Sequence, residues 1–204
     1  MARISDPKYH SNVFINCPFD SEYETLFRAL VFSIHYCGFV PRCAKEFNDS
    51  GDVRIDKILR LITDSKFAIH DLSRVEPRFN MPLELGIFIG CRTFGAKMHR
   101  DKNYLIIEAD SYRFKKFISD ISGQDIESHQ DTPEQLIPAV RNWLSSKRQS
   151  TIPSGSIVVE EYNQFKEVLP NLCAPHRWKV DELKFTEYSA LVVAWLTLSQ
   201  LSEN

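Results

Sequence analysis

The chain has 204 residues, 43% hydrophobic and 25% charged, which is typical of a globular protein that buries a core of its own. Its 25 basic and 27 acidic side chains give a formal net charge of −2, so bulk nucleic-acid binding is not expected. No apolar run approaches the roughly 18 residues that a membrane span needs. The five cysteines form no CxxC pair and follow no signal peptide. We therefore expect a cytoplasmic protein with reduced thiols and no membrane association.

Apolar runs alternate with helical periodicity through the first half of the chain. The runs predict strands at 13–16, 39–44, 66–71 and 103–110. The periodic segments predict helices at 21–38, 53–65 and 80–91, separated from the strands by polar loops such as 45–52 and 72–79. Alternating strands and helices indicate right-handed βαβ crossovers and a parallel sheet, and the apolar strands fit a sheet covered on both faces.

The second half is predicted to be mainly helical. A helix over 132–148 has Thr132 as its cap and Pro133 at its first position, and a less regular helix is expected near 114–121. The Ser-, Pro- and Gly-containing stretch 150–156 is the only segment with linker composition, and further helices follow at 157–169 and 181–198. We therefore divide the chain into an α/β domain over 1–149 and a helical extension over 150–204. That extension could cap the domain or form an oligomer interface.

Ligands of open parallel sheets bind outside the carboxyl ends of the strands, so this edge is where a site is expected. The polar segment 119–129 could cross the same edge and close a pocket, in its own chain or a neighbour's. Candidate binding residues after the first three strands, with one from that segment, are Asn16, Pro18, Phe19, Asp20, Arg42, Asp71, Ser73, Arg78, Asn80 and Asp125. Arginine suits bidentate phosphate contacts, so Arg42 and Arg78 could hold phosphates, the alternative being surface ion pairs.

Glu84 is the candidate catalytic residue. It stands between Leu83 and Leu85 near the start of a helix, where a buried carboxylate is costly unless it has a partner or a task. Asn80 is a plausible N-cap, and a capping-box glutamate would occupy position 83 instead. The helix N-terminus favours the ionised form of Glu84, and a carboxylate there could stabilise or trap a positive charge developing on a sugar carbon. The alternative is a helix-start glutamate that faces water or pairs with Arg54 or Arg78.

Three segments, VFINCPFD, IHDLS and RFNMPLELGIFIG, together resemble the nucleoside 2-deoxyribosyltransferase-like and TIR-like group of nucleotide-binding proteins. The resemblance covers about residues 12–110 and implies a Rossmann/flavodoxin-like, three-layer α/β fold. It implies Glu84 as the catalytic carboxylate and Asp71 as a ligand-binding acid. It also implies Asn80 as a pocket residue and the 16–20 turn as the lining of the sugar site. The sequence 78–82 departs from the transferases and favours the TIR-like side, where the nicotinamide–ribose bond of NAD is cleaved, often in antiviral defence.

The resulting hypothesis is an N-glycosidase that acts on a nucleotide, with NAD as its substrate and with no metal or other cofactor. Alternatives are a nucleoside 2-deoxyribosyltransferase, a nucleoside or nucleotide hydrolase, and a non-catalytic nucleotide-sensing module. For Asp71 the alternative role is a strand-end Asx turn, and for Cys17 a buried small residue is favoured over a nucleophile. Constant NAD hydrolysis would be toxic, so a homo-oligomer or a regulatory partner is expected to control it.

Overall fold

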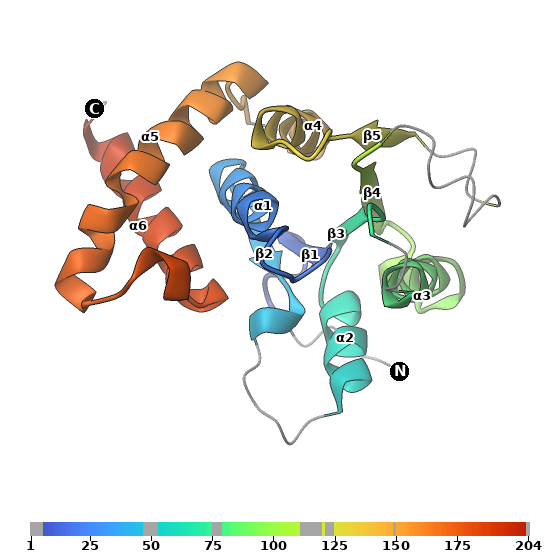
Figure 1. Ribbon diagram of the computed structural model, residues 1–204. Helices are drawn as coiled ribbons and strands as arrows, with labels where there is room; N and C mark the ends of the chain where they lie inside the picture. Colours follow the sequence, from blue (N-terminus) through green and yellow to red (C-terminus); the bar gives the residue numbers. More distant parts are fainter. Residues whose placement is uncertain are drawn as a thin grey trace.

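Five parallel strands form one sheet in the order β2-β1-β3-β4-β5. The computed structural model describes residues 6–46, 53–74, 79–110, 120, 125–148 and 150–202, and the sheet runs through its centre (Figure 1). The strands are β1 (Asn12–Asn16), β2 (Val40–Arg42), β3 (Phe67–Asp71), β4 (Asn103–Glu108) and β5 (Ile126–Ser128). This order and the parallel pairing confirm the predicted Rossmann/flavodoxin-like α/β class.

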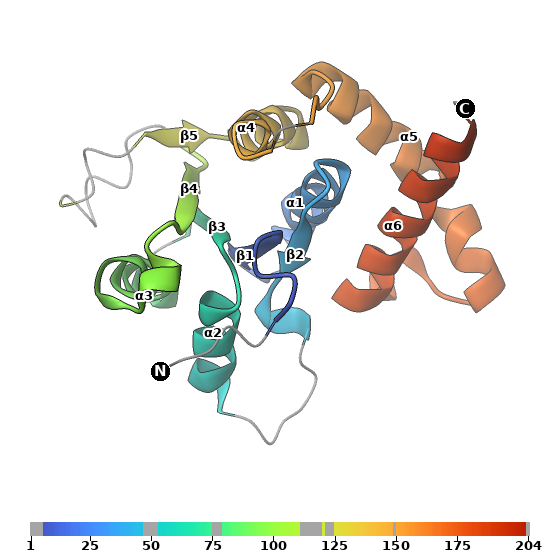
Figure 2. The same ribbon diagram turned by 180° about the vertical axis from the view of Figure 1, so that it is seen from behind.

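Helices cover both faces of the sheet, as its apolar central strands require. Figures 1 and 2 show α1 and α4 on one face and α2 and α3 on the other, with α5 and α6 packed outside α1. Short 3₁₀ turns lie at Ala44–Glu46, Lys97–His99, Ala174–His176 and Val180–Glu182. The helices are α1 (Glu24–Tyr36), α2 (Arg54–Thr63), α3 (Asn80–Phe94), α4 (Pro133–Ser145), α5 (Gly155–Cys173) and α6 (Phe185–Ser202).

Of two local expectations about helix starts, the first is wrong and the second holds in position. The first helix begins at Glu24 instead of residue 21, because the Asp20 carboxylate accepts the backbone N–H of Tyr23 and holds 21–23 in a turn. At α4 both predictions hold in position: Thr132 is the N-cap residue and Pro133 opens the helix, although the Thr132 hydroxyl donates to the carbonyl of His129 and makes no cap hydrogen bond. The helix expected near 114–121 lies outside the described residues, except for position 120.

Strand β5 was not predicted and falls inside the polar segment 119–129. It has three residues at the sheet edge, and its Glu127 is exposed, so it lacks the apolar run that marks the central strands. Its pairing with β4 runs from Ile106 opposite Ile126 to Glu108 opposite Ser128. The carboxyl end of the segment therefore extends the sheet instead of lying across its edge.

The extension from residue 150 shares its core with the α/β segment. Phe32 of α1 contacts Tyr162 and Phe165 of α5 and Trp195 of α6, with ring centroids 5.2–5.9 Å apart. A Cβ on Gly155 would lie 2.7 Å from Pro138, so α5 begins in direct contact with α4. The two sequence segments thus pack around one continuous apolar cluster.

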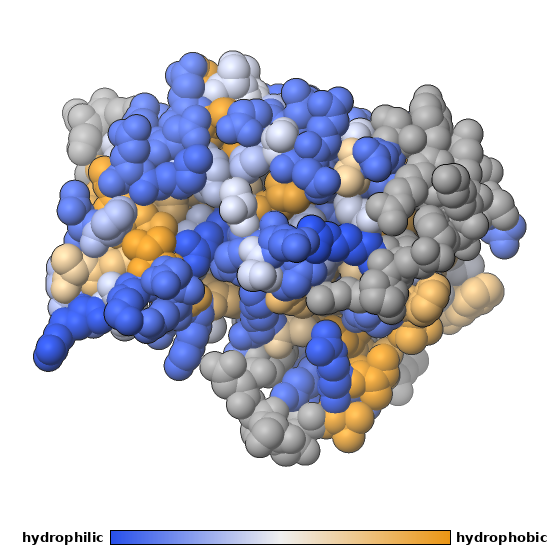
Figure 3. Space-filling model, viewed as in Figure 1, coloured by the Kyte–Doolittle hydropathy of each residue, from blue (hydrophilic) through white to orange (hydrophobic). Residues whose placement is uncertain are grey.

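The outer faces of α2 and α3 carry exposed apolar side chains, among them Ile55, Leu59 and Leu83. Figure 3 shows hydrophobic surface at the lower right, where these helices lie in Figure 1. The self-association predicted from the sequence stays a prediction. Among the described residues, no helix combines the length and the apolar character that crossing a membrane requires.

Candidate functional site

A pocket of about 590 Å³ opens at the carboxyl edge of the sheet, where the segments after β1, β2 and β3 meet. The chain leaves β1 towards α1 on one face and leaves β3 towards α3 on the other. This divergence makes the crevice at which ligands bind in this class of fold. Its described lining residues are Cys17, Phe19, Ala44, Lys45, Arg54, Asn80 and Met81.

Asn16 fixes the start of α3 against the sheet. It is buried at the end of β1, and its amide nitrogen donates to the backbone oxygen of Met81 over 2.9 Å and contacts Nδ1 of His70 at 3.0 Å. Because the amide group supplies the donor, Nδ1 of His70 is the acceptor, and the imidazole proton lies on Nε2. The structure thus assigns the predicted binding residue Asn16 a clear part in positioning the helix that carries Glu84.

The turn after β1 lies at the pocket as predicted, and its residues differ in their contacts. Pro18 is buried, whereas the ring of Phe19 lines the pocket and packs edge-to-face on Phe27 with centroids 5.4 Å apart. The Asp20 carboxylate accepts a hydrogen bond from Nη1 of Arg74 at 3.0 Å and another from the backbone N–H of Tyr23, just before α1. Phe19 is therefore the residue of this turn best placed to contact a ligand.

Glu84 lies on the first part of α3, directly behind the pocket wall, and is 6% exposed. Asn80 is exposed, lines the pocket and donates from Nδ2 to Oε1 of Glu84 over a long 3.4 Å. Asn80 is the first residue of α3 and makes no side-chain cap, so the predicted capping role is wrong. Among the described residues no basic side chain forms an ion pair with Glu84.

Burial raises the pKa of Glu84, against the lowering effects of the Asn80 hydrogen bond and the charge of Arg54. The sequence-based expectation that the helix N-terminus favours the ionised form of Glu84 therefore names only one of the opposing effects. The side chain sits a turn inside the helix, where the loss of water outweighs the favourable field of the terminus. A carboxylate desolvated in this way interacts strongly with any positive charge that a substrate develops beside it.

Asp71 ends β3 at the expected edge, but its side chain is fully buried and does not line the pocket. Its carboxylate accepts the Tyr23 hydroxyl, the backbone N–H of Ser73 at 2.8 Å and Nε2 of His129 at 3.0 Å. The Ser73 hydroxyl also bonds to Asp71 and accepts the backbone N–H of Ala109. Asp71 and Ser73 are thus joined in a buried network that ties three strand ends together.

His129 also belongs to this network. From the sequence it is included only within the polar segment 119–129 and is not predicted as a candidate residue. It lies in the β5–α4 turn, where Gln130 and Asp131 adopt positive φ values of 49° and 53°. Its two ring nitrogens are separately engaged, one by Asp71 and the other by the backbone N–H of Asp131. Nothing in the sequence near 129 indicates a partner at position 71, because the pairing depends on β5 joining the sheet.

The structure disperses the remaining predicted binding residues. The Arg42 guanidinium pairs with Asp6 and with Glu46, whose Oε2 lies 2.9 Å from Nε, so the ion-pair alternative describes it and the phosphate role has no support here. Asp125 is exposed just before β5. Arg78 lies outside the described residues.

Two basic residues that were not among the predicted binding residues do line the pocket, namely Lys45 after β2 and Arg54 at the start of α2. The pocket also receives the N-terminus of α3, and helix N-termini attract anions through their unpaired N–H groups. The position of Lys45 just after the second strand could have indicated a binding role from the sequence, but only the folded chain brings its side chain close to Phe19. The pocket is therefore suited to an anionic ligand.

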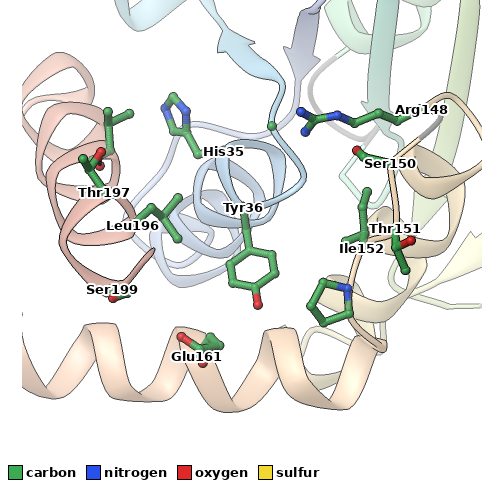
Figure 4. A pocket seen from close by; sticks show the side chains of 13 residues that line it. His35, Tyr36, Arg148, Ser150, Thr151, Ile152, Glu161, Leu196, Thr197 and Ser199 are labelled. Carbon is green, nitrogen blue, oxygen red and sulfur yellow. Dashed lines mark hydrogen bonds between the residues drawn. The ribbon is translucent and has the colours of Figure 1, made fainter. Parts of the chain in front are cut away.

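A second pocket of about 630 Å³ adjoins the first and shares Phe19 and Lys45 with it. It lies between the start of α1 and residues 181–188 of the extension. A third pocket, of about 510 Å³, lies at the other end of α1, where Figure 4 shows Tyr36 pointing towards α5 and its Glu161. Since α1 has 13 residues, about 20 Å of helix separates this third pocket from the candidate site.

No group of three or more potential metal ligands gathers within the described parts of the chain. No protein-family model, curated protein or solved structure gives a significant match to the sequence or the fold. The residues and geometry of the site itself are therefore what a functional proposal has to start from.

Proposed function

We propose that this protein cleaves the N-glycosidic bond of a nucleotide, with NAD as its substrate and Glu84 as the carboxylate beside the reacting sugar. The observation that carries the proposal is the position of Glu84. It is a desolvated acid on α3, behind a pocket at the point of the sheet edge where the chain leaves β1 and β3 towards opposite faces. Such a carboxylate stabilises the oxocarbenium-like transition state of glycoside cleavage.

The charges of the pocket favour a phosphorylated substrate over a nucleoside. Lys45, Arg54 and the start of α3 line it, and none of its described lining residues is acidic. Phosphate groups can therefore bind at the pocket while the sugar carbon faces Glu84. Since no described lining residue carries a carboxylate, we assign the acid beside the reacting bond to Glu84, which Asn80 connects to the pocket.

A single carboxylate suits NAD in particular. When the bond between C1′ and the nicotinamide nitrogen breaks, its electron pair returns to the positively charged ring, so the leaving group needs no proton. Water adds to C1′ and releases a proton, giving nicotinamide and ADP-ribose. A neutral purine, by contrast, departs more readily with a general acid to protonate it, and the pocket lining offers no carboxyl group for that task.

The second candidate function is a nucleotide-sensing module without catalysis. It is favoured by the low exposure of Glu84 and by the position of Asn80, which stands between that carboxylate and the open pocket. In an enzyme the Asn80 side chain must move or bind the sugar itself, and the 3.4 Å bond between the two residues is weak enough to exchange.

Product analysis by liquid chromatography separates these functions. Purified protein is incubated with NAD, with ribonucleosides and their monophosphates, and with deoxynucleosides. We expect nicotinamide from NAD and at least a 10²-fold loss of rate in Glu84→Gln. Glu127→Gln is the matched control, because it makes the same change at an exposed position of β5. Nucleotide binding without release of any base from any substrate would favour the sensing module.

A further inference from the structure

We propose that the helical extension forms the distal half of the substrate cleft and that the substrate is therefore a dinucleotide, whose second nucleoside binds between α1 and the start of α6. The inference rests on the proposed function, which already names a dinucleotide, and adds to it the place where the second nucleoside binds and the part that residues 181–188 take in binding it. Its starting point is the pair of adjoining pockets that share Phe19 and Lys45.

Lys45 forms a ridge between the two pockets together with Phe19. Its ammonium group lies 5.3 Å from the ring centroid of Phe19, 4.6 Å from that of Phe27 and 3.1 Å from the Glu24 carboxylate. The side chains of Lys45 and Glu24 are each 33% exposed, so exchanging this pair for a phosphate contact costs little. A diphosphate that crosses the ridge would contact Lys45 there and Arg54 in the first pocket, which lies beside Glu84 and is called proximal below, the second pocket being distal.

The chemistry of the second pocket fits a nucleoside and disfavours a terminal phosphate. The partly exposed ring of Phe19 offers apolar surface on which a base can pack, and the almost fully buried rings of Phe27, Phe185 and Tyr188 make the rest of the lining apolar and rigid. Carboxylates at Asp181 and Glu182 lie among its lining residues, and carboxylates are suitable acceptors for ribose hydroxyls. Its volume of about 630 Å³ lies within the usual range for small-molecule sites.

The wall contributed by the extension is held firmly against α1. Nη2 of Arg28 donates to the backbone oxygen of Val180 over 2.7 Å, and the Tyr188 hydroxyl donates to the backbone oxygen of Arg28 over 3.2 Å. The Phe27 and Phe185 rings pack with centroids 5.9 Å apart. A wall fixed from both ends of this short segment can discriminate between substrates by shape.

The proposal is tested with tryptophan substitutions that fill the distal pocket from either wall and leave the proximal pocket unchanged. Thr25→Trp acts from α1 and Lys184→Trp from the extension, and both positions are exposed and line only the second of the two pockets. The control is Thr186→Trp, an exposed α6 position outside both. For each protein, kcat and KM are measured with NAD and with nicotinamide mononucleotide. Circular dichroism verifies that each variant is folded.

We expect the ratio of kcat/KM for NAD to that for the mononucleotide to fall at least tenfold in Thr25→Trp and Lys184→Trp, mainly through KM. The ratio in Thr186→Trp should equal that of the wild type. Equal ratios in all four folded proteins would overturn the dinucleotide cleft while leaving the glycosidase intact.

If no protein releases nicotinamide from either substrate, the proposed function fails and the cleft is tested by binding alone. Calorimetric titration with ADP-ribose should then show at least tenfold weaker binding to Thr25→Trp and Lys184→Trp than to Thr186→Trp. Equal affinities, or no binding by the wild type, would overturn the cleft as well.

Discussion

Nε2 of His129 lies 3.0 Å from the buried carboxylate of Asp71 and joins the β5–α4 turn to the end of β3. The backbone N–H of Asp131 donates to Nδ1 over 3.1 Å, so the ring proton lies on Nε2 and points at Asp71. The Ser73 hydroxyl lies 3.0 Å from the same Nε2 atom. In a nucleophilic triad the serine and the acid occupy opposite nitrogens, so these three residues form a structural network and no triad.

Removing the Asp71 carboxylate is expected to destabilise the fold strongly. In Asp71→Ala the Tyr23 hydroxyl, the Ser73 N–H and the His129 ring all lose a buried acceptor. We expect the free energy of unfolding to fall by about 3 kcal/mol or more, measured by urea denaturation. Asp125→Ala, at an exposed position, should change it by less than about 0.5 kcal/mol.

A double-mutant cycle checks that the network is the cause. Tyr23→Phe should cost less in the Asp71→Ala background than in the wild type, because its acceptor is already missing. Strictly additive losses would show that Tyr23 and Asp71 stabilise the fold independently.

Glu84→Gln is expected to stabilise the protein at neutral pH, in addition to lowering the rate of NAD cleavage. Burial raises the folded-state pKa of Glu84 above its ordinary value of 4.5. The folded protein therefore binds the proton more tightly, and the stability that this provides is lost as the pH rises from 4.5 through the folded pKa. Glutamine removes that loss, so thermal melts should show a higher Tm for the variant at pH 7 and a smaller difference at pH 4. A lower Tm at both values would contradict a desolvated carboxylate at this position.

His70 is expected to weaken the fold in mild acid. It is fully buried beside Phe88, its Nε2 has no hydrogen-bond partner among the described residues, and burial lowers its pKa from 6.5 to about 3. Below pH 6.5 this histidine binds a proton in the unfolded chain but not in the folded protein. The free energy of unfolding therefore falls by about 1.4 kcal/mol for each pH unit of acidification. Comparing pH 7 with pH 5, that is about 2 kcal/mol.

The variant His70→Gln separates this contribution from those of other groups. Glutamine keeps an acceptor for Asn16 but does not titrate, so its stability should fall less between pH 7 and pH 5, by about 2 kcal/mol, than that of the wild type. Urea denaturation at both pH values measures the difference. Equal pH dependence in the two proteins would mean that His70 already accepts a proton in the folded state.

Cys17 should resist alkylation in the folded protein. It is buried after β1, and burial together with the nearby Asp71 charge raises its thiol pKa well above 9. Of the five free cysteines, only Cys91 is not classed as buried. Mass spectrometry after brief iodoacetamide treatment is therefore expected to find the modification at Cys91 first, with catalytic rate unchanged. Early modification of Cys17 with loss of activity would revive the nucleophile interpretation.

The sequence alone determined the α/β alternation and the place of Glu84 on a helix at the carboxyl edge. Apolar runs such as 13–16 and 66–71 have few alternatives to buried parallel strands, and a 3.6-residue periodicity marks the helices between them. These are local signals, so they needed no knowledge of which segments meet. Strand β5 carries no such run, because an edge strand buries little side-chain surface.

The tertiary structure decided what each polar side chain does. Asp71, Arg42 and Asn16 all stand at the predicted edge, yet their roles depend on His129, Asp6 and Met81, residues 36 to 65 positions away. The pairing of Phe19 and Lys45 with the extension likewise joins segments more than 130 positions apart. Hydrogen bonds and burial are properties of neighbours in space, and for residues this distant in the chain only the folded arrangement of the sheet makes them neighbours.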